Sequence, residues 1–128
     1  MMTGRILDVM IVEDERIITM MLGRMIEKLG HRVCACAASA DEAMEILERV
    51  SPDLVFLDIH LDGHEDGIQV GESLAKKGSA PFVYATAYTD ADTRERAARS
   101  KPLAFVAKPV TLETVKELCD AVSEARAV

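Results

Sequence analysis

Carboxylate, hydroxyl and ammonium side chains each follow a short apolar run in this sequence, at Glu13-Asp14, Asp58, Thr86 and Lys108-Pro109. If the three carboxylates lay close together, they would repel one another and raise each other's pKa, unless a cation lay among them. Oxygen ligands of this kind suit Mg²⁺ or Mn²⁺. Glu13, Asp14 and Asp58 are therefore candidate metal ligands.

The same residues could carry out phosphoryl transfer. A carboxylate such as Asp58 can accept a phosphoryl group if a metal ion and a lysine neutralise the phosphoryl oxygens and a hydroxyl group binds the remaining one. Lys108 and Thr86 would supply the ammonium and the hydroxyl group. Any one of these residues alone would be interpreted as a solvated loop residue, but their joint occurrence favours a site.

A calcium-binding loop is a second interpretation of the acids that begin at Asp58. The stretch DIHLDGHEDGIQ resembles an EF-hand loop in part. Asp58 and Asp62 stand at the acidic positions one and five, and Gly63 stands at the glycine position six. His60 and Gln69, however, replace two other ligands, and a strand pattern precedes the loop where an EF-hand has a helix. Chemistry at Asp58 is the better interpretation.

The hydrophobic pattern predicts the elements that position these residues. Short apolar runs predict strands over Ile6–Val12, Arg32–Ala37, Leu54–Leu57, Phe82–Thr86 and Ala104–Ala107. A helical pattern follows each strand. Helix ends and caps are predicted at Gly30, at Ser39 with Glu42, near Gly78 and at Thr111.

Apolar strands that alternate with helices predict an α/β fold with a doubly wound five-stranded parallel sheet, covered on both faces. The carboxyl ends of parallel strands meet at one edge of a sheet. The candidate residues should therefore converge near the point where the strand order reverses.

Length and composition limit the domain count and the partners. With 128 residues and 49% hydrophobic residues, residues 1–128 are expected to form one domain without an output domain. The formal net charge of −7 disfavours direct binding to nucleic acid or to a membrane surface. Because the first residues form neither a signal peptide nor a membrane span, we expect a cytoplasmic protein.

Two sets of sulfur-containing residues are assigned to the core. Cys34, Cys36 and Cys119 are expected to be buried free thiols, with Cys34 and Cys36 on one strand face. Met20, Met21 and Met25 fall at core spacing on the first helix.

In their order along the chain, the acidic pair, Asp58, Thr86 and Lys108-Pro109 resemble the receiver domain of two-component response regulators. The resemblance covers essentially the whole chain. No single motif is strong, but together they are specific. The resemblance implies a flavodoxin-like (βα)5 fold in which Asp58 takes a phosphoryl group from a histidine kinase or a phosphotransfer protein.

The resemblance also implies individual roles. Mg²⁺ would be bound by Glu13, Asp14, Asp58 and the main-chain carbonyl of His60, while Thr86 and Lys108 would contact the phosphoryl group. A cis peptide bond before Pro109 would aim Lys108 into the site. His60 and Tyr88 would flank the path of the hydrolytic water, and Tyr88 is expected to prolong the lifetime of the aspartyl phosphate.

Three features depart from the usual pattern of this family. The first acid is Glu13 where Asp is commoner, which is a tolerated variant. The loop HLDGHEDG is longer than usual, and Asp62, Glu65 and Asp66 are interpreted as solvated acids. Ser100-Lys101-Pro102-Leu103 precedes the last strand where many members have Gly-Ala and acids, which argues against the salt bridges that some relatives use to dimerise.

The resemblance implies a switch at Phe105, which holds the family's switch-aromatic position three residues before Lys108. If the Thr86 hydroxyl moved toward a phosphoryl group, Phe105 would turn inward into the space that it leaves. The polar helix over Asp90–Arg99 buries little apolar surface, so a modest push could move it.

We therefore expect an unknown downstream protein, with an acidic patch, to bind the face formed by that helix, the last strand and the last helix. Arg94, Arg96 and Lys101 lie on or near this face in the predicted fold. A second interpretation is that these basic residues only keep the face soluble.

The alternative function is an Asp-nucleophile phosphatase of the haloacid-dehalogenase type. Such an enzyme needs a second Asp two residues after the nucleophile, and here that residue is His60. A receiver would not be a turnover enzyme. We expect only Mg²⁺-dependent self-phosphorylation from a phosphodonor and slow self-dephosphorylation.

Overall fold

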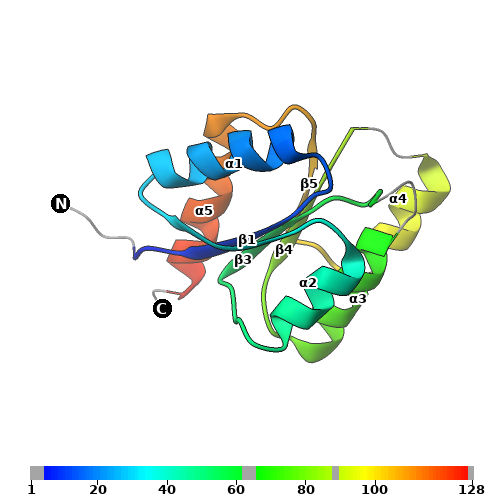
Figure 1. Cartoon of the computed structure of the whole chain (residues 1–128). Helices are drawn as coiled ribbons and strands as arrows, with labels where there is room; N and C mark the ends of the chain where they lie inside the picture. Colours follow the sequence, from blue (N-terminus) through cyan, green and yellow to red (C-terminus); the bar gives the residue numbers. More distant parts are fainter. Residues whose placement is uncertain (1–4, 62–65, 88–89, 127–128) are drawn as a thin grey trace.

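The computed structural model describes residues 5–61, 66–87 and 90–126. Within them, parallel strands form one sheet in the order β2-β1-β3-β4-β5 (Figure 1). The strands are β1 Asp8–Val12, β2 Arg32–Ala37, β3 Leu54–Leu57, β4 Phe82–Thr86 and β5 Ala104–Ala107. The helices are α1 Arg16–Lys28, α2 Ala40–Leu47, α3 Asp66–Lys77, α4 Ala91–Ala98 and α5 Leu112–Arg126. The predicted doubly wound five-stranded parallel sheet is confirmed.

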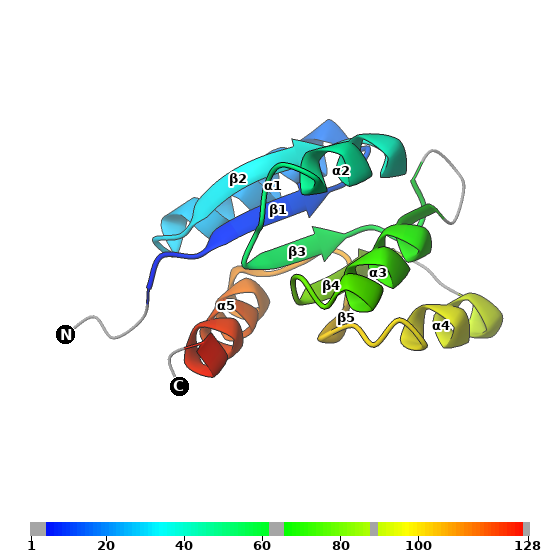
Figure 2. The same ribbon diagram turned by 90° about the horizontal axis from the view of Figure 1, so that it is seen from below.

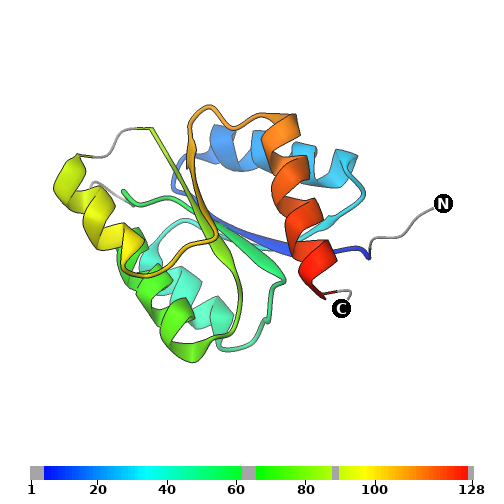
Figure 3. The same cartoon turned by 180° about the vertical axis from the view of Figure 1, so that it is seen from behind.

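Helices cover both faces of the sheet. α1 and α5 lie on one face, and α2, α3 and α4 lie on the other (Figures 1 and 3). Val9 and Phe56 point into the apolar cluster under α1 and α5, whereas Met10 and Leu57 point into the cluster under the other helices. Side chains of β1 and β3 thus alternate between two cores, which explains why these strands are apolar throughout.

The strand order reverses at β1, because β2 and β3 lie on its two sides (Figure 2). β1, β3 and β4 are almost entirely buried, while the edge strands β2 and β5 are partly exposed. In an open parallel sheet, the crevice at such a reversal is where ligands bind. Here it lies between the carboxyl ends of β1 and β3.

The helix caps agree with the sequence pattern. The side chains of Ser39, Asp90 and Thr111 each accept a hydrogen bond from the backbone N–H three residues later, at 3.1, 2.8 and 3.2 Å. Gly30 and Gly78 follow α1 and α3 with φ of 88° and 61°, in the left-handed region that ends many helices. Among the described residues, no helix has both the length and the apolar character needed to cross a membrane.

The methionines of α1 do not all belong to the core. Leu22 and Ile26 are buried and Met25 is half-buried, but Met20 and Met21 are 56% and 52% exposed. The prediction for Met20 and Met21 was wrong because α1 packs on the sheet along a narrower stripe than the apolar spacing suggests. Both side chains contribute to an exposed apolar surface.

The predicted burial of the cysteines is correct for Cys119 only. Cys34 is half-buried and Cys36 is exposed. The register of β1 against β2 shifts between Val9 and Met10, which inserts one extra residue into β2. As a result, Cys34 packs on the cluster under α2, whereas Cys36 pairs in register with Ile11, whose side chain faces the other cluster.

The three thiols should therefore differ in reactivity. Burial raises the pKa of Cys119 to about 11, and burial also raises the pKa of Cys36, although its side chain remains exposed. In the folded protein at pH 8, we expect iodoacetamide to label Cys36 first and Cys119 at least about tenfold more slowly. Peptide mass spectrometry would measure both rates, with Cys36→Ser as the control. Equal labelling of the two residues in the folded protein would contradict the described packing.

Candidate functional site

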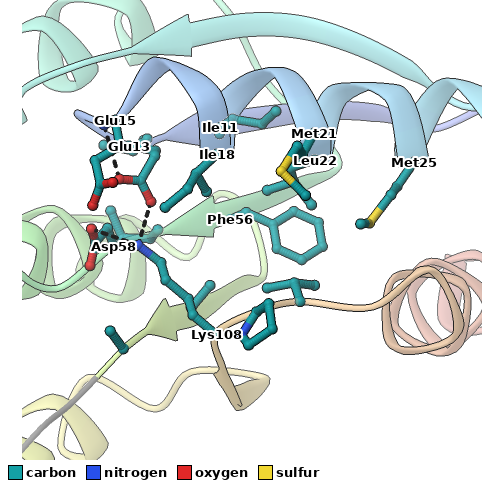
Figure 4. A pocket seen from close by; sticks show the side chains of 16 residues that line it. Ile11, Glu13, Glu15, Ile18, Met21, Leu22, Met25, Phe56, Asp58 and Lys108 are labelled. Carbon is teal, nitrogen blue, oxygen red and sulfur yellow. Dashed lines mark hydrogen bonds and ion pairs between the residues drawn. The ribbon is translucent and has the colours of Figure 1, made fainter.

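The carboxyl ends of β1, β3, β4 and β5 bring the predicted site residues to one edge of the sheet. Side-chain oxygens of Glu13, Asp14 and Asp58 lie within 4.8 Å of one another. Lys108 extends toward Glu13 and Asp58 from the loop after β5 (Figure 4). Thr86, the last residue of β4, is buried at the same edge.

Backbone hydrogen bonds continue the sheet for one residue beyond three strands. The N–H groups of Glu13, Asp58 and Lys108 donate to the carbonyls of Ala37, Val12 and Thr86 at 2.9, 3.0 and 3.1 Å. The site residues are therefore held by the sheet itself and not by flexible loops. Each of these three polar residues is the first one after an apolar strand, so the end of the strand determines its position.

An ammonium group compensates for the charge of two buried carboxylates. The Lys108 Nζ atom lies 2.6 Å from Glu13 Oε1 and 3.1 Å from Asp58 Oδ2. The side chains of Glu13, Asp58 and Lys108 are only 4%, 8% and 11% exposed. Charges so far removed from water require a partner, because removing one member leaves an uncompensated charge.

The environment also shifts the pKa of two of these groups. Burial raises the pKa of Glu13 to about 6, against the opposing effect of its hydrogen bond from Lys108. Burial alone would lower the pKa of Lys108, but its hydrogen bond to Glu13 and the nearby charge of Asp58 raise it. Lys108 therefore remains charged, and a further positive charge near Glu13 would stabilise the ionised form of its carboxyl group.

Backbone N–H groups orient both carboxylates. The N–H of Glu15 donates to Glu13 Oε2 at 3.1 Å, and the N–H of His60 donates to Asp58 Oδ1 at 3.2 Å. Both oxygens of Asp58 thus have a partner, one from the main chain and one from Lys108. The sequence did not reveal these two donors, because any residue type can supply a main-chain N–H group.

The donor set fits a hard divalent cation. Glu13 and Asp58 are buried and Asp14 is half-exposed, so the three carboxylates form a cluster that is open on one side. Carboxylate oxygens are the ligands that Mg²⁺ prefers in proteins. The cluster predicted from the sequence is therefore brought together by the fold and could hold such an ion.

The sequence model of the response regulator receiver domain matches residues 9–120. The chain belongs to this family. Among curated relatives, the transcriptional regulatory protein PdtaR of Mycobacterium tuberculosis is 36% identical over 104 residues, which cover 81% of this chain and 50% of PdtaR. The positive alginate biosynthesis regulatory protein of Pseudomonas aeruginosa is 33% identical over 87% of this chain and 45% of its own. The chain spans about half the length of these relatives.

Solved structures agree with this family. The signal receiver domain of a modulated diguanylate cyclase from Desulfovibrio desulfuricans G20 has a TM-score of 0.88 at 29% identity, over 96% of this chain and 98% of that one. The receiver domain of the Erythrobacter litoralis PhyR response regulator has a TM-score of 0.78 at 30% identity, over 91% and 89% of the two chains. The flavodoxin-like receiver fold is confirmed, and no comparison supports the haloacid-dehalogenase alternative.

An apolar cavity of about 300 Å³ extends from the charged cluster of this receiver along α1. Glu13, Asp58 and Lys108 line one end, and Met21 and Met25 line the other (Figure 4). This cavity could not be predicted from the sequence, because its walls come from α1, the sheet and the loop after β5. It places apolar surface directly beside the carboxylates.

The peptide bond between Lys108 and Pro109 is cis, as the family resemblance implied. Asp62, Glu65 and Tyr88, which were assigned to the surface and to the water path, lie outside the described residues. Asp66 begins α3, and its side chain lies outside the part of the chain that the structure describes.

Gly67 is a site residue that the sequence analysis missed. Its N–H donates to the carbonyl of Ile59 at 3.1 Å, and a Cβ atom at this position would lie 1.8 Å from the carbonyl oxygen of Asp58. Only glycine permits this approach of α3 to the loop after β3. A glycine so soon after a candidate nucleophile was the one signal available in the sequence.

Gly67→Ala should therefore lower both the stability and the reactivity of the site. Because the added Cβ collides with main chain, we expect a loss of about 1–3 kcal/mol in the free energy of unfolding, measured by urea denaturation. Gly23→Ala in α1 is the matched control, since its Cβ would lie 3.8 Å from the nearest atom, Val33 Cγ2. The control should be stabilising by up to about 1 kcal/mol. Equal stability changes in the two variants would contradict this account.

Proposed function

We propose that Asp58 accepts a phosphoryl group from a histidine kinase or a phosphotransfer protein, and that the modification switches a protein-interaction surface. The observation that carries this proposal is the shared Lys108 ammonium group, within hydrogen-bond distance of both Asp58 and Glu13. The membership of the chain in the receiver family supports the same assignment.

In the proposed reaction, a carboxylate oxygen of Asp58 attacks the phosphorus of the donor. A new O–P bond forms while the P–N bond of a phosphohistidine breaks, and the leaving imidazole takes up a proton. Lys108 turns from the carboxylates to a phosphoryl oxygen, and the Thr86 hydroxyl donates to another.

Glu13, Asp14 and Asp58 would hold Mg²⁺ together with the main-chain carbonyl of His60. When bound, Mg²⁺ neutralises the oxygens of the transferring phosphoryl group. Burial raises the pKa of Glu13, so added positive charge would stabilise its carboxylate form.

The protein is not proposed as a turnover enzyme. Each chain is modified at its own Asp58, and water then releases phosphate slowly from the aspartyl phosphate. The formal net charge of −7 makes nucleic acid and membrane surfaces poor direct partners, so the receiver is proposed to act through other proteins. We also propose that it does so in the cytoplasm.

The phosphodonor protein is proposed to dock on α1. Its histidine has to reach Asp58, and α1 presents three exposed apolar side chains, because Ile17, Met20 and Met21 are 69%, 56% and 52% exposed. Met21 also lines the apolar cavity that ends at Asp58. A donor that covers this face would exclude water from the transfer.

The downstream protein is proposed to bind the face formed by α4, β5 and α5. Arg94 and Lys101 are exposed there, and Leu103, two residues after Lys101, is 46% exposed. Basic side chains around an exposed leucine suit a partner that presents acids around an apolar side chain.

A first test is the site of modification. With Mg²⁺ and acetyl phosphate, we expect one added phosphoryl group per wild-type chain and none on Asp58→Asn, because the amide is a poor nucleophile. Asp92→Asn, which changes an exposed acid of α4, is the matched control and should be labelled like the wild type. Intact-protein mass spectrometry measures the result, and phosphate retained by Asp58→Asn would refute the assignment.

A second test separates donor docking from chemistry. The donor is a phosphorylated phosphotransfer protein that labels the wild type. Ile17→Glu should lower the rate of transfer from this donor roughly tenfold or more, because a charge replaces a central apolar contact. Labelling by acetyl phosphate should stay at the wild-type rate. Ile6→Glu, at a 62% exposed position before β1 and at the opposite edge of the sheet, is the control. Equal transfer rates for Ile17→Glu and the wild type would exclude docking on this face.

A further inference from the structure

Tyr84 on β4 is fully buried, two residues before Thr86, and its side chain packs in the cluster under α3 and α4. Its hydroxyl oxygen lies 2.7 Å from the Oγ atom of Ser100, two residues after α4. Ser100 Oγ in turn donates to the carbonyl of Ala97 at 2.6 Å. A serine hydroxyl has one hydrogen, so Tyr84 is the donor to Ser100. Two consecutive hydrogen bonds therefore connect β4 to the last turn of α4.

The Tyr84 hydroxyl reaches this place because α3 leaves room for it. A Cβ atom at Gly71 would lie 2.1 Å from the Tyr84 hydroxyl oxygen and 3.0 Å from the Phe82 ring. Gly67, one turn earlier on α3, is the residue that touches the Asp58 carbonyl. The same helix thus contacts the phosphoacceptor loop at one glycine and the Tyr84 hydroxyl at the other.

The side chains of α4 bury little apolar surface against the sheet. Of its residues, only Thr93 and Ala97 are buried. The Arg94 guanidinium lies 4.4 Å above the Phe105 ring, and that ring lies 5.5 Å from the ring of Tyr84. Tyr84 therefore lies under two of the attachments of α4, one through its hydroxyl and one through Phe105. An element with so few apolar contacts is sensitive to the loss of a single buried hydrogen bond.

We propose that the Tyr84 hydroxyl and Ser100 form a latch that positions α4 on β4 and carries the modification state of Asp58 to residues 97–101. The latch rests on the proposed function of Asp58. A shift of the phosphoacceptor loop reaches Tyr84 by two routes: along α3 from Gly67 to Gly71, and along β4 from Thr86. A buried tyrosine hydroxyl without a partner is costly, so the latch is either made or replaced by another bond. Tyr84 is thus a positioning residue.

The test uses Tyr84→Phe, which removes the hydroxyl and keeps the ring. Without ligand, amide hydrogen exchange in residues 93–101 should rise roughly fivefold, as expected for one lost hydrogen bond. When Mg²⁺ and beryllofluoride are added as the phosphoryl mimic, wild-type amide shifts should change around Asp58 and at residues 97–101. In Tyr84→Phe, the changes around Asp58 should persist while those at 97–101 fall to less than about half.

Two further variants make the test independent of general stability. Ser123→Ala removes a buried serine of α5, on the other face of the sheet, and should leave exchange in α4 unchanged. Ser100→Ala removes the same latch from its other end, so the double variant with Tyr84→Phe should exchange no faster in α4 than the faster single variant.

The outcomes distinguish the latch from the proposed function. If Tyr84→Phe keeps wild-type exchange in α4 and the full response at 97–101, or if the two latch variants act additively, the latch is wrong and the proposed function stands. If the wild-type amides around Asp58 do not respond to Mg²⁺ and beryllofluoride, the proposed function itself fails.

Discussion

The carboxylates of Glu13 and Asp58 are almost completely buried, and the ammonium group of Lys108 compensates for the charge of both. Lys108 follows β5, whereas Asp58 follows β3, and adjacent strands lie about 4.8 Å apart, so the lysine has to pass over the end of β4. This requirement explains the alanines beside Thr86. Ala85 and Ala87 line the same cavity as Lys108, and larger side chains there would obstruct its path to the carboxylates. The charge balance at β1 and β3 therefore constrains the sequence of β4 and β5.

Much of this arrangement could be predicted from the sequence, because it depends on local patterns. β2, β3, β4 and β5 have the predicted bounds. For β3 and β5 the reason is that Asp58 and Lys108 end the apolar run. The convergence of the three acids could be predicted because the carboxyl ends of parallel strands meet at one edge of the sheet. β1 is shorter than predicted because Ile6 is exposed and Leu7 precedes the paired residues.

The features that could not be predicted depend on partners remote in sequence or on irregular register. Cys34 and Cys36 were expected on the same strand face, but one extra residue in β2 places them on different faces. No residue type marks that insertion. The bond between Tyr84 and Ser100 requires that α3 present Gly71 at the same place, which joins three elements. Periodicity identifies which face of a helix is apolar, but not how much of that face the sheet covers, as Met20 and Met21 show.

The two faces of the sheet differ in how tightly their helices are held. On one face, α1 borders the cavity beside Asp58 and exposes apolar side chains, which favours contact with another protein at the site of transfer. On the other face, α4 is attached mainly through Ala97, Thr93 and the latch to Tyr84. Since buried apolar area is the main term that fixes a helix on a sheet, α4, whose buried residues are Thr93 and Ala97, needs little energy to move. In the proposed function, the phosphoryl donor would thus bind at the α1 face, and the structural change that follows at the carboxyl ends of the strands would alter the α4 face.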